Sequence, residues 1–186
     1  MIPVLIVVGV LFVGVLVVMS AYNGLVSLRE QVRGAWAQID VLLKRRYDLI
    51  PNLVETVKGY AAHEKSTLEA VIAARNQAVA VSGNPAQLSQ AEGQLTGALR
   101  QLFAVAEAYP DLKANANFME LQRELTGTEN VIGQTRQHYN SLVASYNTAI
   151  LSFPNNLLAG PFGFHPQPFF EIQDAAQREA PVVKFT

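Results

Sequence analysis

The chain has 186 residues, half of them hydrophobic and only 16% charged. No Asp, Glu, Lys, Arg or His precedes Arg29, so the charged residues all belong to the later part of the chain. That part is long enough to bury a core, which excludes an intrinsically disordered or multi-span protein. The absence of cysteine excludes a disulfide framework, a thiol nucleophile and a thiolate zinc site. The net charge of −1 argues against general nucleic-acid binding.

The first segment, residues 1–22, predicts a transmembrane anchor. Residues 2–22 carry no charge, and as a helix they would rise about 31 Å, close to the hydrocarbon thickness of a bilayer. A cleaved signal peptide is the alternative, but such a peptide begins with basic residues, and no Lys or Arg precedes this apolar run. We therefore expect residues 2–22 to remain in the lipid bilayer as a single span.

The charges that follow the span predict its orientation. Residues 23–46 contain five basic and two acidic side chains, whereas the rest of the chain contains nine basic and thirteen acidic ones. Basic flanks normally stay in the cytoplasm. We therefore expect the amino terminus outside and the body of the protein in the cytoplasm.

Residues 23–154 predict an all-α body, an antiparallel up-down bundle of four long helical segments. Apolar residues recur at alternating spacings of three and four, which is typical of one buried helix face, and no period-two pattern indicates a sheet. The first stripe comprises Leu25, Leu28, Val32, Ala35, Ile39, Leu42, Arg46, Leu49, Leu53, Val57 and Tyr60. We expect this helix to continue straight out of the membrane and to kink at Pro51.

Three further helices are expected. The second covers residues 65–81, with Leu68, Val71, Ile72 and Ala78 inward. A turn at residues 82–85 places a glycine after it and a proline in the first turn of the third helix. The third stripe comprises Leu88, Ala91, Leu95, Ala98, Leu102 and Val105, and Tyr109-Pro110-Asp111 ends or bends that helix. The fourth stripe comprises Phe118, Leu121, Leu125, Thr128, Ile132, Thr135, Tyr139, Leu142, Tyr146, Ile150 and Phe153, before Pro154.

The last segment, residues 155–186, predicts an irregular aromatic tail. Residues 155–172 are rich in Pro, Gly, Phe and Asn, which excludes a helix through the prolines. We expect an ordered loop packed against the bundle or against a neighbouring subunit. Residues 181–185 alternate weakly and predict either an added strand on a partner or a frayed terminus.

No catalytic, cofactor or metal site is predicted. The chain contains no nucleophile elbow, phosphate-binding glycine loop or dinucleotide fingerprint. Its three histidines, His63, His138 and His165, lie in different segments. His63-Glu64 begins like a zinc-protease motif, but the second histidine is replaced by Thr67.

Two clusters of polar side chains are dense enough to be considered as candidate sites. On the first helix they are Asp40, Lys44, Arg45, Tyr47, Asp48 and Asn52, and on the fourth Glu129, Asn130, Arg136, Tyr139, Asn140, Tyr146 and Asn147. One interpretation is a hydrogen-bonded network that sets the helix register. The other is a binding site, which requires Asp40, Arg45, Glu129 and Arg136 to converge on a cavity. Arg46 lies on the core stripe and is expected either to snorkel or to meet a carboxylate from another helix, Glu129 being one candidate. Trp36 is expected to anchor the core.

Three stretches of the chain resemble the LemA family. They are Tyr22-Asn23-Gly24-Leu25-Val26, the segment from Ala35 to Val54, and a series from Tyr109-Pro110-Asp111-Leu112-Lys113 through Glu129-Asn130, Tyr139-Asn140, Tyr146-Asn147 and Phe153-Pro154 to Phe169-Phe170-Glu171. The resemblance implies a bacterial protein of the cytoplasmic membrane, with one span and an up-down helical body. It implies no enzymatic activity and no cofactor. It also implies a link to membrane proteases of the HtpX type and to TPM-domain proteins.

Together these features predict a non-enzymatic, membrane-anchored helical scaffold or adaptor. We expect it to form a homo-oligomer and to act in envelope maintenance or membrane protein quality control, without nucleic acid. A ligand sensor or enzyme that uses the polar clusters is one alternative. The other is an organiser of anionic lipid through Arg29, Arg33 and residues 44–46.

Overall fold

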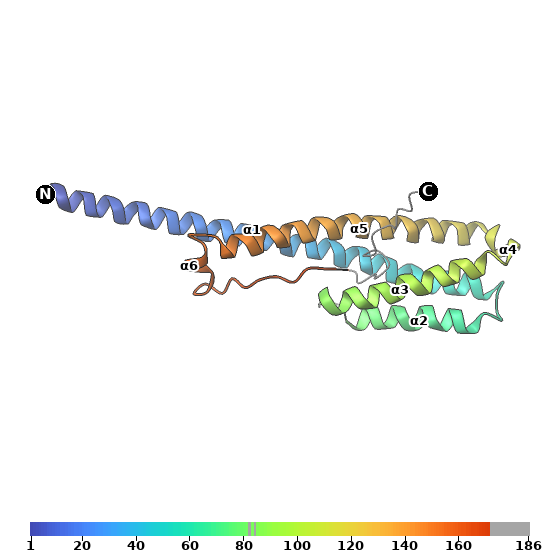
Figure 1. Cartoon of the computed structure of the whole chain (residues 1–186). Coiled ribbons are helices and arrows are strands. Elements are labelled where there is room, and N and C mark those ends of the chain that lie inside the picture. The colour runs from blue at the N-terminus through green and yellow to red at the C-terminus, as the bar shows by residue number, and fades with distance from the viewer. Residues whose placement is uncertain (82, 84, 172–186) are drawn as a thin grey trace, which may run out of the picture. The chain divides into compact units, whose positions relative to one another are not determined.

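The structure, a computed structural model, describes residues 1–81, 83 and 85–171 (Figure 1). Its helices are α1 (Ile2–Lys58), α2 (Lys65–Ala80), α3 (Pro85–Ala106), α4 (Pro110–Lys113), α5 (Ala116–Leu151) and α6 (Asn156–Ala159). No strand occurs among the described residues. The predicted all-α class is therefore confirmed.

The chain divides into two compact units, and the long helices α1 and α5 contribute to both. Unit 1 comprises residues 1–39 and 135–169. Unit 2 comprises residues 40–134, together with Phe170 and Glu171. Each unit is described separately below.

Helix α1 runs without a break from Ile2 to Lys58, as predicted for a helix that continues out of a membrane. In the described part of the chain it is the one helix that is long and apolar enough to span a bilayer, and its most apolar stretch is not covered by protein. Burial begins at Leu25, just after this stretch. Pro51 lies within the helix and does not end it, while the predicted kink there stays a prediction.

The buried stripe of α1 differs from the prediction at Leu42 and Leu49, whereas the predicted Arg46, Leu53 and Val57 are buried. Leu25, Val32, Ala35 and Ile39 are buried as predicted. Farther along, Leu43 and Ile50 are fully buried, whereas the predicted Leu42 and Leu49 are only half-buried. A straight helix has 3.6 residues per turn, so a strict seven-residue pattern drifts around it. Tyr60 was wrongly placed on the stripe, because α1 ends at Lys58 and Tyr60 is exposed.

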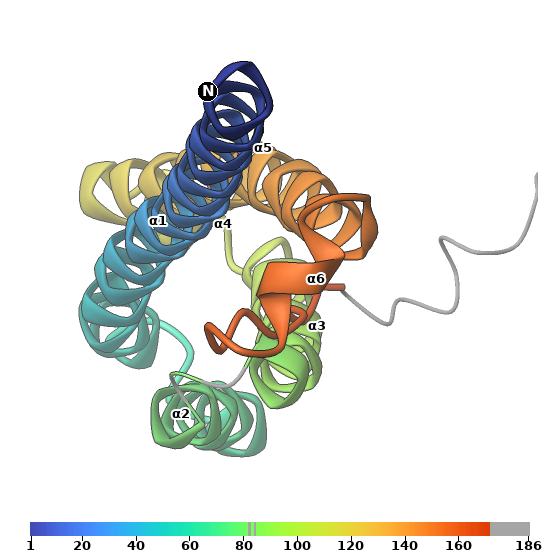
Figure 2. The same cartoon turned by 90° about the vertical axis from the view of Figure 1, so that its left-hand side faces the viewer.

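Unit 2 is a helical bundle in which α2 and α3 pack side by side as antiparallel neighbours (Figures 1 and 2). Leu68, Val71 and Ala78 of α2 are buried as predicted, but Ile72 is exposed. The connection between these helices includes Gly83, whose φ of +97° lies in the left-handed region that favours glycine. The next helix begins at Pro85, as expected from the fixed φ of proline.

The chain between α3 and α5 is more regular than expected. Tyr109-Pro110 ends α3 as predicted, but one helical turn, α4, follows at once. Asn115 then caps α5, because its side-chain Oδ1 accepts a hydrogen bond of 3.0 Å from the backbone N–H of Phe118. Phe153 was wrongly placed on the buried stripe of this helix, which ends at Leu151.

In unit 1, the tail packs against α1 and α5. The prediction of an ordered loop is confirmed for its described residues, except that the short helix α6 begins it. Phe164 is buried, and its ring lies 5.7 Å from that of Tyr22 on α1. Tyr139 of α5 donates a hydrogen bond of 2.9 Å to the carbonyl of Pro168. The strand or frayed end predicted for residues 181–185 lies outside the described residues.

Candidate functional site: a buried ion network

The most distinctive polar site in unit 2 centres on Arg46 of α1. This side chain lies on the buried stripe between Leu43 and Ile50, and the residue is only 2% exposed. A buried guanidinium is costly unless charged and polar partners surround it. The neighbouring helices supply those partners.

Two carboxylates and one hydroxyl bind the guanidinium. Its Nη1 lies 2.6 Å from Oε2 of Glu92 on α3. Its Nη2 lies 2.8 Å from Oε2 of Glu129 on α5 and also donates to Oγ1 of Thr96 at 2.9 Å. The Thr96 hydroxyl in turn donates to Glu129 at 3.2 Å. The network therefore ties α1, α3 and α5 together and confirms the predicted pairing of Arg46 with Glu129.

Tyr47 completes the network by donating its phenolic hydrogen to Oε1 of Glu92. Burial raises the pKa of the Glu92 carboxyl, although the Arg46 guanidinium and the Tyr47 hydroxyl act in the opposite direction. Burial also raises the pKa of Tyr47, and the nearby Glu92 charge adds to that effect. Tyr47 is therefore held as the neutral donor and is not poised to act as a base near neutral pH.

A proline creates a second link, between α1 and α2. In a helix the carbonyl of residue 47 would accept the N–H of residue 51, but Pro51 has no N–H. The Tyr47 carbonyl instead accepts a hydrogen bond of 3.1 Å from Nε of Arg75 on α2. The proline thus frees an acceptor that a neighbouring helix uses.

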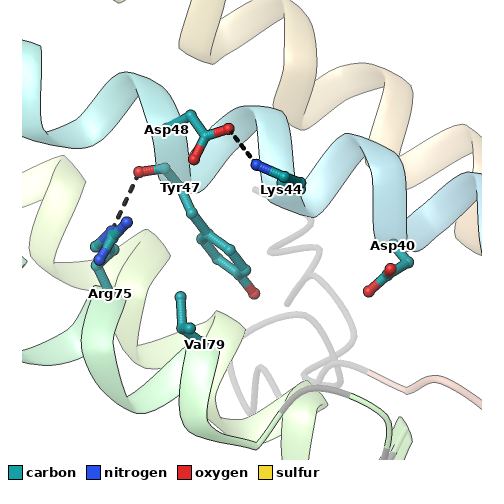
Figure 3. Close-up of a pocket in the computed structure, with 6 residues that line it drawn as sticks. All are labelled: Asp40, Lys44, Tyr47, Asp48, Arg75 and Val79. Atoms are coloured by element: carbon teal, nitrogen blue, oxygen red, sulfur yellow. Dashed lines mark hydrogen bonds and ion pairs between the residues drawn. The ribbon is translucent and has the colours of Figure 1, made fainter.

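An open pocket of about 300 Å³ lies beside this link. Figure 3 shows Asp40, Lys44, Tyr47 and Asp48 on α1, with Arg75 and Val79 on α2. The Tyr47 ring points into the space between the two helices, and Lys44 pairs with Asp48 at 2.8 Å. Three of the charged residues that line the pocket are therefore engaged, Lys44 with Asp48 and Arg75 with the Tyr47 carbonyl.

A second pocket, of about 200 Å³, lies on the other side of the network and is lined by Arg46, Thr96, Leu99, Arg100, Phe103, Leu125, Thr126, Glu129 and Asn130. Asp40 and Glu129 therefore line different pockets. Arg45 pairs with Glu124 at 2.5 Å. Within unit 2, neither pocket thus brings together Asp40, Arg45 and Glu129, as the alternative interpretation of a binding site requires.

The members of the predicted cluster on α5 from Arg136 onward belong to unit 1, where Tyr139 and Asn147 hold the tail. Asn147 makes two hydrogen bonds with the backbone of Gln167. Its side-chain amide donates one of 2.9 Å to the Gln167 carbonyl, and its Oδ1 accepts one of 2.8 Å from the Gln167 N–H. Trp36 packs against the Tyr139 ring at 5.3 Å between centroids, as expected of a core anchor. These side chains thus stabilise unit 1 and do not open a site.

The structure places no metal-binding group of three His, Asp or Glu side chains among the described residues. His63, His138 and His165 are all exposed. The described polar groups of unit 2 thus form an ion network that links three helices. Two shallow pockets lie beside this network.

Sequence reasoning missed Glu92, the most buried carboxylate of the network. The sequence spacing could have indicated it. Residues 88, 92, 95, 99 and 102 also follow alternating spacings of four and three, and this second stripe on α3 includes Glu92. The nearby Ala91 also fits an apolar stripe, which hid the acidic residue next to it.

An uncovered apolar helix continuous with an all-helical body defines a membrane-associated helical protein. More narrowly, the chain belongs to the LemA family, which it matches over residues 35–185.

Relatives extend this comparison. Magnetosome protein MamQ of Magnetospirillum gryphiswaldense is 26% identical over 187 aligned positions, covering 87% of this chain and 68% of the relative. Magnetosome protein MamQ 2 of Paramagnetospirillum magneticum is 27% identical with the same coverage. Protein LemA of Metamycoplasma hominis is 25% identical, covering 82% of this chain and 69% of the relative.

Proposed function

We propose that this protein is a non-enzymatic, single-span scaffold or adaptor that self-associates at a bacterial membrane. The observation that carries the proposal is the continuity of α1. One helix contains the uncovered apolar stretch and, farther along, the buried stripe with Arg46. Such a helix would transmit the position of the bundle directly to the anchor.

The polar chemistry of unit 2 supports a structural role. Arg46, Glu92 and Tyr47 satisfy one another, and none is aimed at an enclosed cavity. The raised pKa of Tyr47 keeps its phenol neutral. The names of the relatives do not designate enzymes. A ligand sensor would need the charged residues at one pocket, and in unit 2 they line two.

The proposed location is the cytoplasmic membrane, with the soluble part in the cytoplasm. Arg29 and Arg33 follow the span closely and favour that side. There the scaffold would serve envelope maintenance or protein quality control, with a membrane protease or a TPM-domain protein as its proposed partner.

Co-purification of two differently tagged full-length copies from one membrane preparation tests the proposal. One tag is expected to recover the other, or to recover a membrane protease or TPM-domain protein in constant proportion. Recovery of single copies without either companion would contradict the scaffold.

A truncation pair sharpens this test. Deletion after Glu171 leaves the described contacts of unit 1 intact, whereas deletion after Pro154 removes the Phe164 and Gln167 contacts. If residues 172–186 mediate association, both deletions reduce co-purification. If only the second deletion does, residues 172–186 are not the contact.

A further inference from the structure

The turn from the end of α5 through α6 exposes several large apolar side chains. They are Leu151 at 75%, Phe153 at 80%, Leu157 at 64% and Phe162 at 53% of their full exposure. We refer to residues 151–162 as the apolar turn. Large apolar groups gathered in one exposed segment mark an interaction surface more often than chance exposure does.

The apolar turn lies beside the point where the anchor ends. Within unit 1, the ring of Phe162 meets that of Tyr22 edge-on, with 5.1 Å between centroids. Tyr22 is the last residue of the predicted anchor, residues 2–22 of α1. Tyr and other aromatic side chains are favoured at the boundary between lipid tails and headgroups.

The charge of unit 1 also suits a membrane surface. Residues 137–170 contain no Asp, Glu, Lys or Arg, so no charge opposes entry of the apolar turn into lipid. The charged side chains of unit 1 are three arginines and Glu30, which leaves the unit net positive.

One of these arginines, Arg29, is placed to reach headgroups. Arg29 and Arg33 line an open cavity of about 470 Å³ together with Val32 and Gln167. Arg29 lies seven residues beyond Tyr22, or about 10 Å along the helix. The headgroup region extends roughly 5–7 Å beyond the hydrocarbon core, which a long arginine side chain reaches from that distance.

We infer that the apolar turn inserts into the interfacial region of the same bilayer that the anchor crosses, with Arg29 at the level of the anionic headgroup phosphates. This inference rests on the proposed membrane anchor. It gives unit 1 a second attachment to the membrane, which restricts the rotation of α1 about its own axis.

A second copy of the chain is the competing occupant of this surface. Two net-positive units would repel each other across such a contact, whereas an anionic bilayer attracts both. The apolar turn also contacts Tyr22, which ends a segment proposed to lie in lipid. The bilayer is therefore the favoured occupant.

Spin labels at single cysteines test the inference, because the chain has no cysteine of its own. Nitroxides are attached at positions 153 and 157 of full-length protein in phosphatidylcholine–phosphatidylglycerol vesicles. Position 10 serves as the lipid control, and position 141, exposed on α5, as the water control. Collision rates with oxygen and with a water-soluble nickel complex then report the depth of each label.

The ratio of oxygen to nickel accessibility is expected to be several-fold higher at 153 and 157 than at 141, and to approach that at position 10. If 153 and 157 match 141 while position 10 is lipid-exposed, the apolar turn lies in water and the inference fails, whereas the anchor stands. If position 10 is also water-exposed, the anchor fails and the inference with it. Low accessibility to both reagents, with spin–spin broadening that disappears on dilution with unlabelled protein, would overturn the inference in favour of a second copy.

Discussion

Arg46 occupies a position where the pattern of α1 calls for an apolar side chain. Its charge is tolerated because Glu92, Glu129 and Thr96 reach it from two other helices. Buried ion pairs of this kind add little net stability over an apolar replacement of both partners, but removal of one partner leaves an uncompensated charge. The network is therefore best understood as a device that sets how α1, α3 and α5 align.

Two substitutions, Arg46→Met and the matched Glu92→Gln, test this interpretation of the network. Arg46→Met leaves Glu92 and Glu129 without their cation, and we expect the free energy of unfolding to fall by about 3–5 kcal/mol at pH 7. Glu92→Gln keeps the shape and leaves Arg46 paired with Glu129, so its cost should be clearly smaller. Denaturant unfolding of the full chain in detergent, followed by circular dichroism, compares the two. If Arg46→Met costs no more than Glu92→Gln, loss of the cation leaves no uncompensated charge and the interpretation is contradicted.

The raised pKa of Glu92 predicts a pH dependence with a definite sign. Above the ordinary value of 4.5, the folded state holds the Glu92 proton more firmly than the unfolded state. Stability from this group is thus fully present below 4.5 and is lost as the pH rises through the folded pKa. The free energy of unfolding of the wild type, relative to Glu92→Gln, should therefore decline with rising pH across this window. A difference that grows with pH would show that the pairing with Arg46 outweighs burial.

At the scale of the helices, Pro51 and Arg75 act together. The proline removes the donor for the Tyr47 carbonyl, and Arg75 replaces it at 3.1 Å. Arg75→Met should lower the free energy of unfolding by about 1.5–3 kcal/mol, the range for a hydrogen bond that involves a charged group. In a Pro51→Ala background the helix can satisfy its own carbonyl, so the same substitution should cost less.

A double-mutant cycle measures this coupling, with Arg123→Met on the exposed face of α5 as the control. The control should cost the same in both backgrounds. If Arg75→Met also costs the same in both, the side chain stabilises α2 by some route other than the freed carbonyl.

The helices could be predicted from sequence because their apolar periods are long and their breaks are chemical. Pro85 opens α3, and Pro110 follows its end as expected. The predicted stripe failed at Leu42 and Leu49, because a seven-residue pattern only approximates the true helical period. The prediction for Phe153 failed for another reason. Its position continues the apolar period of the helix, but α5 ends at Leu151.

The site was partly predictable. The pairing of Arg46 with Glu129 followed from a charge on an apolar stripe, which demands a carboxylate nearby. Glu92 was hidden by the adjacent Ala91, and the Arg75 link depends on tertiary placement of a backbone carbonyl. The separation of Asp40 from Glu129 also required coordinates, since helix periodicity does not say on which side of a helix a neighbour packs.

At the scale of the whole molecule, α1 is a helix of the bundle and, in the proposed function, also the membrane anchor. The exposed apolar stretch of α1 is continuous with its buried stripe, so the anchor and the bundle share one backbone. Membership of the LemA family agrees with a membrane-associated protein. A scaffold built this way would work by holding several copies, or a copy and a partner, in one plane.

The mass of the full-length protein in lipid nanodiscs, determined by mass photometry, tests self-association most directly. The account predicts a discrete particle containing several copies, and the same number of copies across protein concentrations. Glu92→Gln serves as a control, because it should leave that number unchanged. A particle containing a single copy at every concentration would contradict the self-associating scaffold.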